Sequence, residues 1–450
     1  METARTDLPK APPLPPDGEL REASGLFAAE GNEVVASFLA ARGWALTDVR
    51  PVQASYRPER SCIVRYQVRA LNPNGDPRRA SICVEVRRRE RGKVDPPPEF
   101  ERRFGLAAPV ERKDPYLVWA FPYDPSLPML PEAASDESMR EVLTQSGHRP
   151  SAVSIAPWAY RPRRRAVFKY IGFYPRATRD RSVTFGKVLR ARKARRVLAA
   201  SANLARGRGI SALLPKRNGG LQLSLPFAHV GERALFFDGV PGRQLQDLLI
   251  VDGPLPEPAR VARVPLEVAN LERRGVARSL PGRSDPLRAA RESARLVTHL
   301  VPDTEGAAHL ILDAVHREHS MERPHRRLIH GDLYEAQLFV HTDYTLGLID
   351  LDDLGLGDPG LDAANFSAHL VALALCVPAA KSRILAYRAL LRAAFLTQLD
   401  MSDRAFAWRE ALCMLLLASG PFRVLAPAWP YELKLRVELA VRLLHSPARA

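Results

Sequence analysis

The chain has 450 residues, which is too long for one small hydrophobic core and favours two lobes or domains. Its hydrophobic content of 46% and charged content of 26% are those of an ordinary globular protein, and no apolar run reaches the roughly 18 residues that a membrane-spanning helix needs. The net charge of +16 is concentrated in residues 151–220, which hold 14 arginines, 4 lysines and a single acid, and such a stretch favours a phosphate-bearing partner.

The N-terminal segment is rich in proline and lacks the apolar core of a signal peptide, so we predict a disordered leader over residues 1–25. Residues 30–42 have helical spacing and end at Gly43, and a β-rich region follows to about residue 121. The four cysteines form no CxxC pair, which gives a zinc site no support and fits a cytoplasmic protein.

An internal repeat marks the front half of the chain. The stretch "YRPERSCIVRY" at 56–66 recurs as "YRPRRRAVFKY" at 160–170, and each copy is followed by a second strand-like run. The alternation has a period of two, which indicates hairpins. With a gap of two residues in the loop, Glu85 aligns with Lys187. We therefore predict a cap-like α/β module over 26–150 and a second β-rich lobe over 151–240, with chance similarity of two arginine-rich strands as the alternative.

From residue 241 to residue 450 the pattern becomes mainly helical. A basic helix is predicted over 191–207, and helical spacing recurs in segments such as "DPLRAARESARLVTHLV" and "KSRILAYRALLRAAFLTQL". Together with the front half, this pattern predicts an α+β protein with a β-rich N-terminal lobe and a helical C-terminal lobe.

Two polar motifs interrupt the helical part. "LIHGDLYEAQLFV" at 328–340 and "GLIDLDDLGLGDPGLDAANF" at 347–366 each place an aspartate, Asp332 and Asp350, directly after an apolar run. Residues 331–362 hold eight acids and no lysine or arginine. A hairpin through "HTDYT" would bring both aspartates to one rim, where two carboxylates suit a Mg²⁺ site with a base beside it.

These motifs resemble the aminoglycoside-phosphotransferase and kinase-like superfamily, whose pattern is H-G-D-x-x-x-x-N, then I-D, then G-D-P-x-x-D-L-A. The resemblance covers about 230–370 and implies a bilobal protein-kinase-like fold that uses ATP and Mg²⁺. By position, Asp332 matches the catalytic base, Asp350 the metal-binding aspartate and Lys187 the lysine that grips the α- and β-phosphates. Asp352 is placed to share the metal.

Other positions follow from the same resemblance. The stretch "FFDGVPGRQLQDLL", which includes Phe237 and Val240, is similar to the hinge where adenine docks on backbone groups. Asp362 matches an aspartate that braces the catalytic loop. Gln337 stands at the position of the metal-binding Asn, a replacement that also resembles maltokinase-like sugar kinases. Its amide oxygen can still bind metal, from one methylene further out.

Two further departures concern the β-rich lobe. No acid occurs between Lys187 and Glu232, so the helix glutamate that usually pairs with the lysine is either missing or replaced by a neutral residue such as Asn203. The turn "YRPRRRA" has no glycine, so Arg164 and its two neighbours either hold phosphates with their side chains or are simply solvated.

The leading hypothesis is therefore an ATP- and Mg²⁺-dependent kinase that phosphorylates a hydroxyl group of a small molecule, a sugar first and an aminoglycoside second. The missing glutamate and glycines favour an alternative, a nucleotide-binding pseudokinase with a scaffolding role. Nucleic-acid binding through 151–220 is a weaker idea, since few exposed-looking aromatic residues accompany the arginines. We expect no membrane partner, and the sequence does not indicate an oligomeric state.

Overall fold

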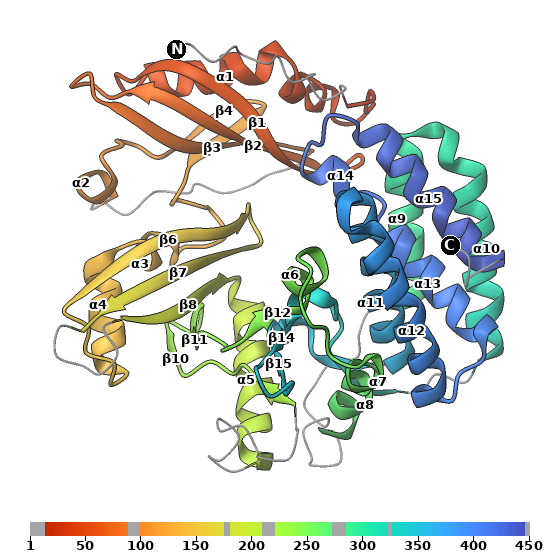
Figure 1. Cartoon of the computed structure of the whole chain (residues 1–450). Helices are drawn as coiled ribbons and strands as arrows, with labels where there is room; N and C mark the ends of the chain where they lie inside the picture. Colours follow the sequence, from red (N-terminus) through yellow and green to blue (C-terminus); the bar gives the residue numbers. More distant parts are fainter. Residues whose placement is uncertain are drawn as a thin grey trace.

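The computed structural model describes residues 14–88, 100–174, 181–208, 221–271, 285–322 and 326–445. Figure 1 shows three parts: an N-terminal sheet with its helices, a second sheet beside it, and a large group of helices along one side. This arrangement confirms the predicted α+β class and the β-rich front and helical back lobes.

The N-terminal part, which we call the cap, is an antiparallel five-stranded sheet in the order β1-β2-β3-β5-β4. Apolar residues on alternate positions of its strands face α1, whose Val35, Phe38 and Leu39 are buried. The elements of the cap are β1 (Ala45–Arg57), β2 (Ser61–Leu71), β3 (Pro77–Arg87), β4 (Val110–Lys113), β5 (Tyr116–Ala120), α1 (Ala29–Ala40) and α2 (Phe100–Phe104). The two helices that follow, α3 (Leu130–Ala133) and α4 (Asp136–Gln145), pack on the second sheet (Figure 1).

The second sheet has the same antiparallel layout, in the order β6-β7-β8-β11-β10. A basic helix, α5, follows its third strand, where the cap has the short α2. Its elements are β6 (Ala152–Arg161), β7 (Arg165–Phe173), β8 (Arg181–Leu189), α5 (Ala191–Arg208), β10 (Ala228–Val230) and β11 (Ala234–Asp238). The front of the molecule therefore contains two five-stranded sheets of one design.

Strand register confirms the predicted repeat residue by residue. Glu85 lies opposite Ile63 in the cap, and Lys187 lies opposite Val167 in the second sheet, so the two charged residues occupy equivalent positions. The β1–β2 and β6–β7 turns match as well, since Glu59 and Arg163 have φ angles of 61° and 62°. Chance similarity of two arginine-rich strands would not reproduce both the register and the turn geometry.

The back lobe is built on long apolar helices, of which α13 packs against both α11 and α15. Its helices are α6 (Leu245–Ile250), α7 (Pro258–Ala262), α8 (Val264–Ala269), α9 (Pro286–Leu300), α10 (Glu305–Met321), α11 (Pro359–Cys376), α12 (Lys381–Leu399), α13 (Asp403–Leu417), α14 (Gly420–Arg423) and α15 (Trp429–His445). Its short strands are β9 (Gln222–Leu223), β12 (Arg243–Gln244), β13 (Arg327–Ile329), β14 (Leu338–Val340), β15 (Leu346–Leu348) and β16 (Gly355–Gly357).

Among the described helices, none alone is long and apolar enough to cross a membrane; the pair Pro359–Cys376 and Pro378–Leu399, bent by 118°, meets the length and composition test only when both are taken together.

Part of the predicted leader is ordered. Residues 1–13 lie outside the described residues, but two 3-10 turns form at Arg21–Ala23 and Gly25–Phe27, and Leu20 is buried. The Asp17 carboxylate accepts hydrogen bonds from Tyr56 Oη at 2.5 Å and from the backbone N–H of Glu59 at 2.7 Å. The prediction of disorder is therefore wrong for 14–25, because contacts with the distant β1–β2 turn order this segment.

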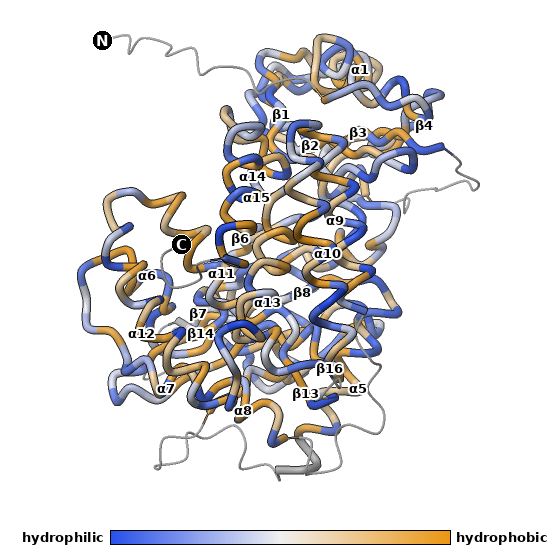
Figure 2. The backbone as a smooth tube through the Cα atoms, turned by 90° about the vertical axis from the view of Figure 1, so that its right-hand side faces the viewer, coloured by the Kyte–Doolittle hydropathy of each residue, from blue (hydrophilic) through white to orange (hydrophobic). Residues whose placement is uncertain are grey.

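The cap also contacts the helical lobe. Tyr56 Oη lies 2.7 Å from His299 Nε2 on α9, and Arg295 on the same helix pairs with Glu59 at 2.6 Å. The ring of Phe422 on α14 lies 5.9 Å from that of Phe27. Both views of the molecule show the cap strands beside α14 (Figures 1 and 2).

A buried carboxylate joins the cap to the second sheet. Glu85, only 1% exposed, pairs with Arg163 of the β6–β7 turn and with Arg87 Nε at 2.7 Å. Arg163 is 7% exposed, so its guanidinium depends on protein partners for compensation of its charge.

Replacing Glu85 with Gln should lower the free energy of unfolding by about 3 kcal/mol, because it leaves a buried arginine without its carboxylate. Urea unfolding of the full chain measures the loss. Glu292→Gln is the control, since it removes an exposed pair with Arg288 on α9 and should cost less than about 0.5 kcal/mol. Equal stability of the two variants would contradict the role of Glu85.

Candidate active site

The loop that carries Asp332 follows β13, and Asp350 follows β15 directly. β14 and β15 pair as the antiparallel hairpin that the sequence predicts, within the four-stranded sheet β12-β14-β15-β9. β13 pairs with β16 in a separate two-stranded sheet, which brings the two polar motifs side by side.

Asp362, on the first turn of α11, holds the start of the catalytic loop. Its carboxylate accepts hydrogen bonds from the backbone N–H groups of His330 and Gly331, both at 2.7 Å. His330 Nε2 lies 2.9 Å from the carbonyl oxygen of Ile349, just before Asp350. These contacts fix the two motifs relative to each other, which is the bracing predicted for Asp362.

Lys187 on β8 lies between two carboxylates. Its Nζ is 2.6 Å from Asp350 Oδ1 and 2.9 Å from Asp352 Oδ1. Burial would lower the pKa of Lys187, but Asp352 and Asp350 outweigh it and raise the pKa, so the ammonium stays charged. Lys187, which the repeat singles out, therefore contacts a carboxylate, that of Asp350, which lies 163 residues later in the sequence.

Arg165 supports the same two carboxylates, at 3.2 Å from Asp350 Oδ2 and 3.7 Å from Asp352 Oδ2. Burial would raise the pKa of Asp350, but Lys187 and Arg165 reverse this and lower it below its ordinary value. For Asp352, burial and the neighbouring Asp350 raise the pKa against the same two cations.

One carboxylate oxygen of this site is suited to bind a divalent cation. The Oδ2 atom of Asp352 is buried and accepts no hydrogen bond from the described residues, so it is available as a ligand. Gln337 is buried as well, and its Nε2 donates to Asp350 Oδ2 at 3.3 Å. Two carboxylates and one amide oxygen are enough for Mg²⁺, which keeps water and phosphate ligands. No cluster of three or more His, Cys, Asp or Glu side chains suited to a metal occurs in the described ranges.

The Asp332 carboxylate has no hydrogen-bond partner among the described residues and lines a cleft. Burial is the main cause that raises its pKa, and the charges of Asp350 and Asp353 raise it further. A partly buried carboxylate with a raised pKa, unpaired and facing open space, is suited to accept a proton.

The three arginines of the β6–β7 turn have separate environments. The Arg163 N–H donates to Asp124 Oδ2 at 2.7 Å, and its guanidinium binds Glu85, so this side chain is not available to phosphates. Arg165 lies at the carboxylates described above. Arg164 is exposed to the cleft and forms no ion pair with the described residues, so of the three it is the one free to bind an anion.

The predicted hinge connects β11 to β12. Phe237 is buried with Leu189, Val197 and other apolar residues between the sheet and α5, and Lys187 Nζ lies 5.4 Å from its ring centre. Val240 packs on β15, where a Cβ atom on Gly347 would lie 2.6 Å from Val240 Cγ1. The glycine is thus needed for the hinge to approach the β14–β15 hairpin.

No acid of α5 pairs with Lys187. The helix instead offers Lys193, whose Nζ lies 2.6 Å from Asp353 Oδ1. In the ion pair that α5 forms, the helix therefore supplies the cation. The carboxylates that pair with Lys187 come instead from the loop after β15.

A cleft of about 480 Å³ opens beside Asp332. It is lined by the cap, the β6–β7 turn and the two polar motifs, and its arginines include Arg57, Arg87, Arg161, Arg164 and Arg190. Of these five arginines, only Arg164 was predicted from the sequence as a site residue. The repeat carried a signal for two of them, because Arg57 and Arg161 occupy equivalent positions in its two copies.

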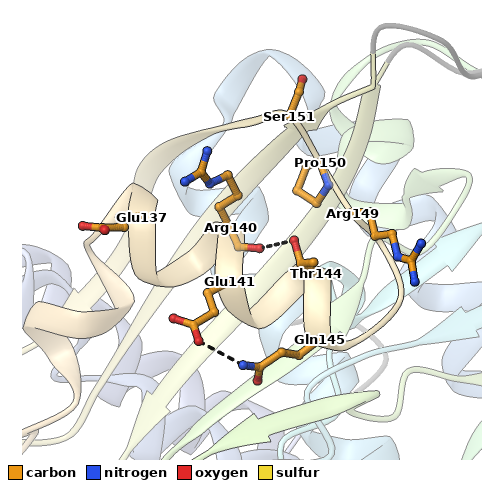
Figure 3. Close-up of a pocket in the computed structure, with 8 residues that line it drawn as sticks. All are labelled: Glu137, Arg140, Glu141, Thr144, Gln145, Arg149, Pro150 and Ser151. Atoms are coloured by element: carbon orange, nitrogen blue, oxygen red, sulfur yellow. Dashed lines mark hydrogen bonds between the residues drawn. The ribbon is translucent and has the colours of Figure 1, made fainter.

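A second hollow, of about 580 Å³, lies on α4 and the residues that follow it (Figure 3). It is lined only by residues 137–151, and its hydrogen bonds join neighbours on the helix, Thr144 to Arg140 and Gln145 to Glu141. None of the predicted site residues lines it, so we place the candidate active site in the cleft beside Asp332.

Two residues of α13 in the back lobe, Trp408 and Glu410, belong to the core. Glu410 is fully buried and pairs with Arg388 at 3.0 Å and Arg392 at 2.8 Å, and Asp403 pairs with Arg392 at 2.6 Å. Trp408 is 1% exposed. These side chains stabilise the packing of α12 and α13 and do not reach the cleft.

The chain is similar to several solved structures at low sequence identity. Similar solved structures include spectinomycin phosphotransferase APH(9)-Ia in complex with ADP and spectinomycin (9% identity, 70% of this chain and 99% of that chain covered, TM-score 0.46). A second is choline kinase LicA from Streptococcus pneumoniae (12% identity, 68% and 98% covered, TM-score 0.44). A third is a thermostable mutant of aminoglycoside phosphotransferase APH(4)-Ia with AMP-PNP and hygromycin B (16% identity, 69% and 99% covered, TM-score 0.43).

No curated protein matches the chain. The family model described as "Phosphotransferase enzyme family" matches residues 179–412, a range that contains Lys187 and both polar motifs. That range is just over half of the 450 residues, and the chain therefore belongs to the phosphotransferase enzyme family.

Proposed function

We propose that this phosphotransferase moves the γ-phosphoryl group of ATP to a hydroxyl group of a small molecule. The observation that carries the proposal is the arrangement around β8 and the two polar motifs. An unpaired carboxylate, Asp332, lies near two further carboxylates, Asp350 and Asp352, that a buried lysine joins. Phosphoryl transfer depends mainly on such positioning of charges.

Each residue has one task in this reaction. Asp332 accepts the proton of the acceptor hydroxyl, whose oxygen forms a bond to the γ-phosphorus while the bond from that phosphorus to the oxygen of ADP breaks. Lys187 and Arg165 carry positive charge toward the phosphates of the nucleotide. Mg²⁺, when bound by Asp350, Asp352 and Gln337, would neutralise charge on the phosphate oxygens.

The acceptor belongs to the sugars and sugar-like hydroxyl compounds. An aminoglycoside is a polycation, and the arginines of the cleft, such as Arg57, Arg161 and Arg164, would repel it. The acids of the site do not offset this repulsion, because Asp350 and Asp352 already pair with Lys187 and Arg165.

Formation of ADP tests the proposal. We expect the full chain to release ADP from ATP with Mg²⁺ and a suitable member of a panel of sugars, sugar phosphates and amino alcohols, and EDTA should abolish this release. ATP binding that needs no Mg²⁺, with no ADP formed from any acceptor, would favour a nucleotide-binding pseudokinase. The observation that favours this alternative is that α5 has no acidic residue to pair with Lys187.

A further inference from the structure

The wall of the cleft that faces Asp332 is formed by arginines from separate parts of the chain. Arg57 ends β1 of the cap, and Arg161 and Arg164 belong to the β6–β7 hairpin. Arg423, on α14 of the helical lobe, is near enough to Arg161 and Arg164 for their charges to act on it. The cap, the second sheet and the back lobe thus each contribute positive charge to one side of the catalytic base.

These arginines differ from Lys187, Arg165, Arg163 and Lys193 in having no acidic partner among the described residues. Lys187 and Arg165 pair with Asp350 and Asp352, Arg163 with Glu85, and Lys193 with Asp353. In contrast, Arg57, Arg161, Arg164 and Arg423 form no ion pair with any described residue. Four guanidinium groups are therefore gathered without an ion pair among the described residues, and the nearby carboxylates of Asp332 and Asp353 offset their repulsion only in part.

Burial and repulsion from neighbouring arginines both lower the pKa values of Arg161, Arg164 and Arg423. Burial lowers the pKa of Arg164, and the charges of Arg161 and Arg57 lower it further. Burial, Arg161 and Arg164 together lower the pKa of Arg423 to about 10. A group of cations that destabilise one another gains stability from an anion placed among them.

Two members of the group, Arg57 of the cap and Arg423 of α14, belong to elements that carry no residue of the predicted nucleotide site. The cations suited to the donor phosphates, Lys187 and Arg165, lie at Asp350 and Asp352. The unpaired group instead includes a residue of the cap and a residue of α14, and the charge of Asp332 acts on both Arg161 and Arg423. This is the side of the catalytic base where the acceptor must lie, since the base has to reach the acceptor hydroxyl.

We propose that the acceptor carries a phosphate monoester, which the group of Arg57, Arg161, Arg164 and Arg423 binds while Asp332 faces the hydroxyl. The inference rests on the proposed kinase function. A phosphate monoester has nearly two negative charges and three acceptor oxygens. It can therefore accept hydrogen bonds from guanidinium groups that belong to three different parts of the chain. A carboxylate has one charge and two oxygens and would leave more of the cluster uncompensated.

Binding to the full chain saturated with Mg²⁺ and AMP-PNP tests the proposal, because the nucleotide then occupies the donor site. Calorimetric titration should show glucose 6-phosphate binding in addition to AMP-PNP, at least about tenfold tighter than glucose or glucuronate. Arg57→Gln should weaken glucose 6-phosphate about tenfold, the loss expected for one charge-assisted hydrogen bond, and change AMP-PNP affinity less than about twofold.

Arg60→Gln is the matched control. It removes the same charge from the exposed end of the same hairpin, outside the cleft, and should leave both affinities unchanged. The proposal is overturned if glucose 6-phosphate binds only when AMP-PNP is absent, if glucuronate binds equally well, or if Arg57→Gln weakens AMP-PNP as much as the sugar phosphate.

The same titration without nucleotide separates this inference from the proposed function. If AMP-PNP does not bind at all, the kinase proposal fails, but glucose 6-phosphate binding that depends on Arg57 would still show the anion site. If AMP-PNP binds with Mg²⁺ and no phosphate monoester does, the kinase proposal stands and the acceptor inference fails.

Discussion

Asp332→Asn should reduce kcat by about 10²–10⁴-fold, the contribution expected of a general base, while the fold remains intact. The pKa of Asp332 is raised, which means that folding disfavours its ionised form at neutral pH. A neutral side chain of the same shape should therefore leave the melting temperature unchanged or raise it. Steady-state release of ADP and a thermal melt of the same sample measure the two effects.

Asp313→Asn provides the comparison for this variant, because Asp313 is exposed on α10 and lies outside the cleft. It should have the kcat of the parent chain. An Asp332→Asn enzyme that retained more than about a tenth of the activity would rule out Asp332 as the base. A large drop in melting temperature would mean that the lost activity reflects folding.

Asp350→Asn should lower kcat/KM by at least about 100-fold, more than the loss typical of residues that only support a metal ligand. The change removes a predicted Mg²⁺ ligand and leaves Lys187 with Asp352 alone. It should also reduce stability. Because Lys187 and Arg165 lower the pKa of Asp350 below its ordinary value of 3.8, its ionised form stabilises the fold above that pH, and this contribution is lost as the pH falls through the lowered value.

Magnesium titrations of AMP-PNP binding separate the metal role from a structural one. The Asp350→Asn chain should need a much higher Mg²⁺ concentration to bind the nucleotide. Asp353→Asn is the control, since Asp353 is about half exposed, lies three residues away and pairs with Lys193. If both variants titrated alike, Asp350 would not be a metal ligand.

The two polar motifs could be identified from the sequence because the residues that define each of them lie close together along the chain. Asp332 and Asp350 each follow a short apolar strand, and the hairpin between them needs only the five residues 341–345. The repeat could be predicted for a similar reason, because the alternation of apolar and polar residues along β2–β3 and β7–β8 can be read directly from the sequence. Lys187 became identifiable once its copy, Glu85, was aligned.

The partners of these residues were not accessible from sequence. Nothing near Lys187 indicates that its partners are Asp350 and Asp352, since the pairing depends on how the second sheet packs on the back lobe. The tasks of Arg163 and Arg164 differ only because Glu85 and Asp124 of the cap reach one of them. The order of residues 14–25 likewise depends on a turn more than thirty positions away.

Besides the ion pairs that Lys187, Arg165 and Lys193 form across the site, two links join the second sheet to the back lobe, and one of them passes through the cap. The hinge after β11 is the first link, and the second runs from Arg163 to Glu85, along the cap, and from Tyr56 to α9. A protein with a single hinge opens by rotating one lobe about it. Here such a rotation would have to break either the buried Arg163–Glu85 pair or the cap's contacts with α9 and α14, so nucleotide exchange should proceed through a nearly fixed entrance, with its width set by side chains.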